Sequence, residues 1–153
     1  VDLGPDLGVE AHLVVESLYS DHPARDWADG ERSPGVVTVA CIHRPAALPE
    51  PQWLHNWHEV QSPVSGELQP RTRYVRNRVV QSLTPEATVV DGIVEESWPS
   101  ARHVADPDLF FNGGGDPERV KANLERMMAN VVACLDLDKL RSTTMSEYAV
   151  RSL

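Results

Sequence analysis

The sequence predicts an α+β domain in which helices cover one face of an antiparallel sheet. Three observations support this prediction. Residues 36–43 form a continuous apolar and β-branched run, as a buried strand requires. Residues 72–83 and 88–98 are two further strand-like runs, separated by a plausible turn. Helical signals occupy residues 51–69 and 116–137.

A closing strand expected over residues 139–150 completes the order β-α-β-β-α-β from residue 36 onward. This order is the split βαβ, or ferredoxin-like, arrangement, which predicts four antiparallel strands with both helices on one face. The strands at 36–43 and 88–98 are apolar on both sides, so the second sheet face also needs a cover. The simplest cover is the sheet of a second subunit, which predicts a homodimer through sheet faces. A tandem repeat is the other partner that fits.

The clearest helix is the one expected over residues 116–137. Asp116 is suited to cap its N-terminus, and Pro117 is suited to its first position. Apolar residues recur at helical spacing, at Val120, Leu124, Met127, Met128, Val131 and Leu135. The glycine run before the helix follows no strand, so we interpret it as a loop rather than an anion site.

Residues 1–35 differ in pattern from the domain expected over 36–153. Residues 9–19 favour a strand, and the polar residues after them, with proline and glycine, are typical of a linker. Residues 15–17 have a weak likeness to residues 146–148 in the closing strand. The N-terminal strand is therefore either an extension of the domain or the end of a preceding repeat.

Length and charge narrow the classes of function. The 153 residues suit one domain, and 41% hydrophobic residues are enough for a core. The net charge of −9 argues against a nucleic-acid partner or an anionic membrane surface, since both need clustered basic residues. No apolar run approaches the length of a membrane span. Cys41 and Cys134 lack the spacing of a zinc site or disulfide framework, so we expect a cytoplasmic protein.

The stretch over residues 51–64 concentrates tryptophan, histidine, glutamate and glutamine. On a wheel of about 100° per residue, one apolar arc contains Trp53, Leu54, Trp57, Val60 and Val64. Gln61 falls inside this arc and His58 at its edge, whereas His55 and Glu59 point to the opposite side. We therefore expect no metal here. Gln61 is either a satisfied core glutamine or a group that lines a cavity.

Alternation along the strands gives further candidates. Asn77 shares the apolar side of its strand, where it is either the preferred cavity group or a satisfied amide of the core or interface. Tyr74 lies on the other side, either as a hydroxyl donor or as part of a packed interface. Glu95 and Glu96 alternate, so one of them faces an interior, as a general base or as the partner of an arginine. Arg44 ends the first strand, where it either holds a substrate carboxylate or pairs with an acidic side chain.

Several motifs in this order resemble the EthD family of actinobacterial and proteobacterial proteins. They are "VTVACIHRP", "WLHNWHEV", "RYVRNRVV" and "VDGIVEESW", within residues 36–150. Such proteins are similar to the dimeric α/β barrels, whose ferredoxin-like subunits pack their sheets face to face. The resemblance implies a homodimer with a pocket between the sheet and the helices. It does not imply a reaction, because fold does not fix chemistry.

The resemblance also implies roles for individual residues. Glu95 matches the glutamate of the family's "DG-x-x-E" strand and is the predicted general base. Family members carry a histidine where this chain has Gln61, and a neutral amide serves neither as a base nor as a haem ligand. His58 is the residue that would take over such a role. The predicted substrate-binding residues are Gln61, Asn77, Tyr74, Trp57 and Arg44.

We therefore expect an EthD-like protein of undefined reaction that needs no cofactor or metal. Its ligand is expected to be a small hydrophobic, oxygenated molecule of catabolism, which it acts on or binds. The alternative is a non-catalytic ligand-binding, accessory or structural dimer, which the loss of the family histidine supports.

Overall fold

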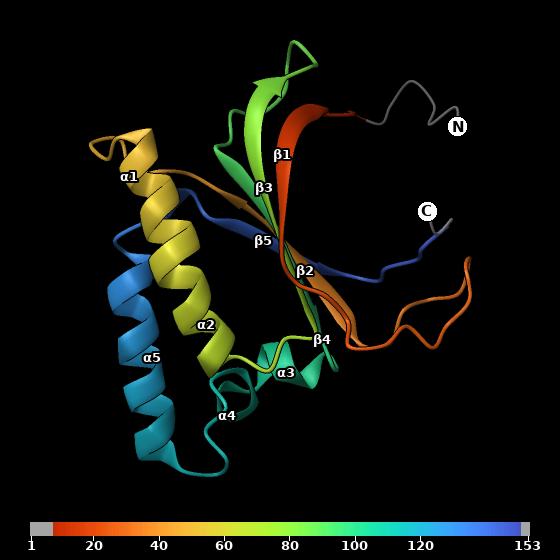
Figure 1. Ribbon diagram of the computed structural model, residues 1–153, viewed down its shortest axis with the longest axis vertical. Coiled ribbons are helices and arrows are strands. Elements are labelled where there is room, and N and C mark those ends of the chain that lie inside the picture. The colour runs from red at the N-terminus through yellow and green to blue at the C-terminus, as the bar shows by residue number, and fades with distance from the viewer. Residues whose placement is uncertain (1–7, 151–153) are drawn as a thin grey trace.

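The computed structural model describes residues 8–150, which form one sheet and a layer of helices (Figure 1). Five antiparallel strands lie in the order β1-β3-β4-β2-β5. They are β1 (His12–Ser20), β2 (Val36–Ile42), β3 (Arg73–Ser82), β4 (Gly92–Trp98) and β5 (Arg141–Met145). The α+β class is confirmed, and so are the three strands expected over residues 36–43, 72–83 and 88–98.

The two long helical segments lie together on one side of the sheet (Figure 1). The first comprises α1 (Glu50–His55), η1 (Asn56–Gln61) and α2 (Ser62–Leu68), and the second is α5 (Pro117–Val131). Short helices α3 (Arg102–Ala105) and α4 (Pro107–Phe110) precede α5, and a 3₁₀ turn, η2 (Leu137–Lys139), follows it. Both expected helices are confirmed. As predicted, Asp116 caps α5 by accepting hydrogen bonds from the backbone N–H groups of Glu118 and Arg119.

The first helical segment changes its winding halfway along. η1 is π-helical, and the Ser62 N–H donates to the Trp57 carbonyl, five residues earlier. Pro63 is the second residue of α2. In an uninterrupted α-helix a proline ring clashes with the carbonyl four residues earlier, and the wider turn relieves that conflict.

The wider turn also rotates the surface that faces the sheet. A regular wheel puts Val60 in the apolar arc, but Val60 is 37% exposed, whereas Ser62 is fully buried. Ser65 and Leu68 are buried about one and two turns further on. The expectation for Val60 was wrong because the wheel assumes a constant angle per residue, and a π turn advances by a smaller angle.

The core between the two layers is centred on the tryptophans of the first segment. Trp53 and Trp57 are buried, with ring centroids 5.0 Å apart, and pack against Ile42, Tyr74 and Val94 of the sheet. Gly92 lets the Trp57 indole lie directly on β4, because a Cβ at Gly92 would be 2.9 Å from Trp57 Cη2. Glycine at the start of β4 therefore sets how closely the helix approaches the sheet.

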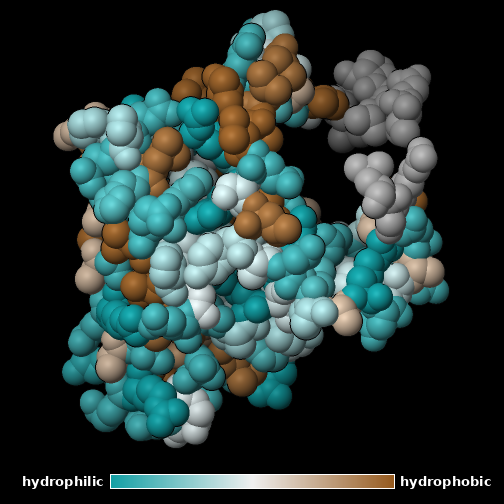
Figure 2. Space-filling view, in the orientation of Figure 1, coloured by the Kyte–Doolittle hydropathy of each residue, from teal (hydrophilic) through white to brown (hydrophobic). Residues whose placement is uncertain are grey.

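β1 forms one edge of the sheet and pairs with β3 along its length. The strand expected over residues 9–19 is therefore confirmed, and it belongs to the same sheet as the other four strands. The outer ends of β1 and β3 extend past the helices (Figure 1). Figure 2 shows apolar side chains gathered over these ends. Those exposed there are Leu13, Val15, Val80 and Leu83.

Residues 21–35 form a loop across one end of the sheet face that points away from the helices, here called the open face. Arg73 lies on that face and is 3.5 Å from Asp21 and 3.7 Å from Glu147. Backbone hydrogen bonds join the loop to the C-terminal segment. In one of them the Ser33 N–H donates to the Glu147 carbonyl at 2.8 Å. The closing strand is shorter than expected because residues 147–149 pair with this loop instead of with β2.

The centre of the open face keeps apolar side chains that remain partly exposed. Val39 and Cys41 of β2 and Ile93 of β4 are half-buried there.

Candidate functional site

A cavity of about 260 Å³ lies between the helices and the sheet. Its floor is formed by β2, β3 and β4, and its walls come from the two helical segments and α4. Most of the lining is apolar, and it includes Ala40, Ile42, Val94, Phe110, Met127, Val131, Cys134, Leu135 and Leu140. The Trp98 ring lies parallel to Phe110, with a centroid distance of 4.9 Å. The cavity thus offers a mainly hydrophobic space with aromatic walls.

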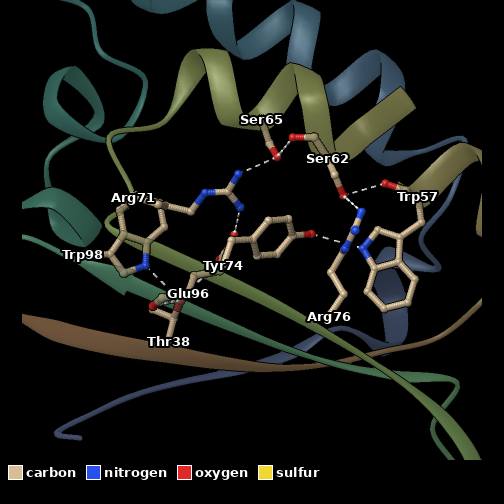
Figure 3. A network of polar contacts seen from close by, with 9 residues as sticks. All are labelled: Thr38, Trp57, Ser62, Ser65, Arg71, Tyr74, Arg76, Glu96 and Trp98. Carbon is tan, nitrogen blue, oxygen red and sulfur yellow. Dashed lines mark hydrogen bonds and ion pairs between the residues drawn. The ribbon is translucent and has the colours of Figure 1, made fainter. Parts of the chain in front are cut away.

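One end of the cavity carries a chain of hydrogen bonds (Figure 3). The indole N–H of Trp98 donates to Thr38 Oγ1 at 3.0 Å. The Thr38 hydroxyl donates in turn to Glu96 Oε2 at 3.3 Å. Thr38 and Glu96 face the cavity because residues 38, 96 and 98 share one face of the paired strands β2 and β4.

Arg71 links this chain to the helical layer. Its Nη1 donates to Glu96 Oε1 at 2.5 Å, and its Nη2 donates to Ser65 Oγ of α2 at 2.8 Å. The guanidinium also lies 4.0 Å from the centroid of the Tyr74 ring. The Arg71 side chain is only 4% exposed, so these partners replace its hydration.

Tyr74 stands in the centre of the polar end (Figure 3). Its hydroxyl accepts a hydrogen bond from Trp57 Nε1 at 3.2 Å. Burial, and next the Glu96 carboxylate, raise the pKa of Tyr74 above its ordinary value. The phenol therefore stays neutral in the physiological range and acts as a hydrogen-bonding group rather than as a base.

Gln61 comes from the π-helical turn and lines the same cavity. Its side chain is buried, and its Oε1 has no hydrogen-bond partner among the groups of residues 8–150. Of the two alternatives for Gln61, the cavity position is thus observed. A buried amide oxygen without a donor is costly, so a rotation of the Gln61 amide toward the cavity would let a ligand satisfy this atom.

A second buried arginine, Arg76, lies beyond Tyr74 and does not line the cavity. Its guanidinium donates to Ser62 Oγ at 3.0 Å, to the His58 carbonyl at 3.3 Å and to Ser17 Oγ at 2.8 Å. No carboxylate between residues 8 and 150 forms an ion pair with it. Burial consequently lowers the pKa of Arg76 from its usual value.

The structure divides the predicted site residues between the two faces of the sheet. Trp57, Gln61 and Tyr74 line the cavity. Asn77 and Glu95 lie together on the open face, where Asn77 Nδ2 donates to Glu95 Oε1 at 2.9 Å. The expectation that Asn77 and Glu95 share a pocket with Gln61 was therefore wrong. The helices cover the Tyr74 side of β3. Arg71 and Arg76 lie on that side, where their guanidinium groups donate hydrogen bonds to Ser65 and Ser62 of α2.

Two further predicted residues lie outside the cavity. His58 packs its ring edge-to-face on Trp57, at a centroid distance of 4.8 Å, and its buried Nε2 has no hydrogen-bond partner among the described residues. Burial, followed by the nearby Arg76 cation, lowers the pKa of His58. Arg44 donates from Nη1 to the Leu48 carbonyl, and its backbone N–H donates to Asp91. Arg44 thus orders the loop after β2 instead of reaching the cavity.

The sequence reasoning missed Thr38, Ser65, Arg71 and Glu96, which form the polar end. Strand alternation did contain a signal for Glu96, since Glu96 shares one strand face with the apolar residues Val94 and Trp98. The resemblance-based preference for Glu95 overrode that signal. Arg71 precedes β3, so alternation gives no information about where its side chain lies.

The chemistry available in the cavity is limited. Across residues 8–150, no group of three histidine, cysteine or acidic side chains is placed to hold a metal ion. Burial raises the pKa of the Cys134 thiol to about 12, so it is not a thiolate at neutral pH. None of the helices within residues 8–150 is long and apolar enough to cross a membrane. Hydrogen bonding and apolar contact are therefore the main interactions that the site can offer.

Glu96→Gln should reduce the free energy of unfolding by about 2–3 kcal/mol, because it leaves the buried Arg71 without its counter-charge. Glu95→Gln is the matched control and should cost about 0–1 kcal/mol, since Glu95 is 35% exposed and Arg73 keeps Asp21 and Glu147. Urea unfolding of both variants measures the difference. Equal losses would contradict the assignment of Glu96 to the interior.

His58→Gln should flatten the pH dependence of stability. Because the folded pKa of His58 lies below the unfolded value of about 6.5, the unfolded state takes up the proton first. The wild-type protein therefore loses stability as the pH falls below about 6.5. Urea unfolding at about pH 7.5 and about pH 5.5 should show a smaller loss for His58→Gln.

His55→Gln is the control for this measurement, because His55 is exposed on the same helical segment. It should keep the wild-type pH dependence. A His58→Gln variant that loses as much stability as the wild-type protein on acidification would refute the role given to His58 burial.

Comparison with known proteins adds no relative: no family model, no curated protein and no solved structure matches the chain. The function therefore has to be inferred from the cavity and from the side chains that line it.

Proposed function

We propose that the protein binds a small hydrophobic, oxygen-bearing molecule in the cavity between the helices and the sheet, without a cofactor. The observation that carries this proposal is the lining of the cavity, which is mainly apolar and carries a few polar groups. Small-molecule sites commonly combine a hydrophobic lining with a few placed polar groups. The apolar part supplies affinity by burial, and the polar end fixes the orientation of the ligand.

The size of the cavity limits the ligand to one or two rings. A dry, apolar cavity of about 150 Å³ is enough to bind benzene. The cavity of this protein has about 260 Å³. A single ring with substituents, or two fused rings, therefore fits.

The proposal is one of binding rather than acid–base catalysis. A general base in the cavity would need a carboxylate or imidazole free to take a proton. The Glu96 carboxylate already accepts hydrogen bonds from Arg71 and Thr38, and His58 does not line the cavity. These contacts favour the non-catalytic alternative over a reaction in which Glu95 or His58 acts as a base.

We further propose that the domain is ferredoxin-like and of the EthD type. Support comes from the strand order β3-β4-β2-β5 with the two long helical segments on one face, and from the motifs that resemble that family. The replacement of the family histidine by Gln61 agrees with a binding role. The free thiols of Cys41 and Cys134 support a cytoplasmic location.

The open face supports a homodimer through sheet faces. Val39, Cys41 and Ile93 keep apolar surface there, and the loop over residues 21–35 covers only one end of the face. A second copy placed on the centre of this face would bury that surface, as a partner sheet does in face-to-face packing.

Ala40→Leu should weaken the binding of naphthol, a neutral two-ring probe, at least ten-fold. Ala40 lines the cavity, so the larger side chain fills part of the space that the probe needs. Isothermal titration calorimetry on the wild-type protein and the variant gives the two dissociation constants. Circular dichroism confirms that the variant is folded.

The control for Ala40→Leu is Ala129→Leu, which makes the same substitution at an exposed position of α5. Ala129→Leu should bind naphthol as the wild-type protein does. Wild-type protein that binds no naphthol, or an Ala40→Leu variant with unchanged affinity, would refute binding in this cavity.

Ile93→Lys should convert the proposed dimer into a monomer. Ile93 lies at the centre of the open face, and a charge there could not be buried against a partner sheet. Sedimentation equilibrium measures the change, with Leu124→Lys on the outside of α5 as the control that stays dimeric. A wild-type protein that is monomeric throughout would rule out the dimer.

A further inference from the structure

We infer that the ligand of the cavity is an uncharged molecule whose hydroxyl group donates a hydrogen bond to Gln61. This inference rests on the proposed function and names the chemical class of the ligand. It follows from the charges in the cavity, from the hydrogen bonds that its polar groups already make, and from the position of Gln61.

The cavity offers no unpaired charge to a ligand. Arg71 and Glu96 are the only charged side chains among its lining residues, and they form an ion pair at 2.5 Å. A carboxylate ligand would have to compete with Glu96 for Arg71, and an ammonium ligand would have to compete with Arg71 for Glu96. Either ion would also lose its hydration in a mainly apolar space, so a neutral molecule is favoured.

The polar end has few hydrogen-bonding positions left. Thr38 accepts from Trp98 and donates to Glu96, and Ser65 accepts from Arg71 and donates to the Ser62 carbonyl. Tyr74 accepts from Trp57. Thr38, Ser65 and the Arg71–Glu96 pair thus satisfy one another, and they hold the polar end in one arrangement.

Two other polar residues lie at the margins of the cavity. Ser142 is exposed, and Gln69 also borders a second hollow on the outside, next to Tyr19. Gln61 differs from Ser142 because it is buried. It differs from Gln69, which is equally buried, because its Oε1 is enclosed and has no partner within residues 8–150. Rotation of the amide about its last side-chain bond directs this acceptor toward a ligand.

A hydroxyl group is the donor that fits these conditions. An aliphatic amine would carry a charge, whereas a hydroxyl group is neutral. A phenol or alcohol supplies one neutral O–H for Gln61, and its ring or chain occupies the apolar remainder. The parallel rings of Trp98 and Phe110 favour an aromatic skeleton, which makes a phenol the best match.

Four probes with one skeleton test this inference on the wild-type protein: naphthol, naphthalene, methoxynaphthalene and naphthoate. Naphthol alone has a neutral donor, and naphthoate carries a negative charge. Calorimetric titration should rank naphthol first, by roughly ten-fold over naphthalene and methoxynaphthalene, with naphthoate the weakest. In Gln61→Met, which keeps the length of the side chain without the acceptor, naphthol should lose this advantage.

Gln52→Met is the matched control, because Gln52 is exposed on the same helical segment and bonds to Asn56. It should keep the wild-type ranking. Equal binding of naphthol and methoxynaphthalene to the wild-type protein, or tightest binding of naphthoate, would overturn the inference and leave cavity binding intact. Failure of all four probes to bind would overturn the proposed function, and the inference with it.

Discussion

Two arginines buried between the helical layer and the sheet are the constraint on which the rest of the structure depends. Arg71 and Arg76 lie on either side of the Tyr74 ring (Figure 3), and a buried cation is tolerated only where hydrogen bonds replace its hydration. For Arg71, the main replacement is the ion pair with the Glu96 carboxylate. Arg76 has hydroxyl and carbonyl oxygens from β1 and from the first helical segment, and the ring faces of two tyrosines.

These requirements determine which surface of the first helical segment faces the sheet. The arginines need Ser62 and Ser65 on the inner side of α2, whereas the core needs Trp53 and Trp57 on the inner side of α1 and η1. One regular helix does not present both sets, and the π-helical turn between them does. The same turn places Gln61 against the cavity. The polar site and the irregular helix thus have one cause.

The sequence predicts the elements of this fold better than it predicts the site. Strand alternation, apolar runs and the cap at Asp116 are local signals, and they identify the strands and both helical segments. Alternation also separates Glu95 from Glu96, but it does not say which face the helices cover. That choice depends on how Arg71 and Arg76 find partners far away in sequence, and on a turn that departs from the usual helical angle. Asn77 and Glu95 were assigned to the pocket for this reason, and Arg71 was overlooked.

The π-helical turn also constrains how the length of this chain can vary. Such a turn contains one residue more than a regular α-helix of the same rise, so deletion of one residue within η1 would restore α-helical winding. Trp53 would keep its place on the sheet. Every side chain after the deletion would rotate by about 100° around the helix axis. Both arginines would then lose their serine partners on α2 at once, so related chains that tolerate such a deletion should also lack the two buried arginines.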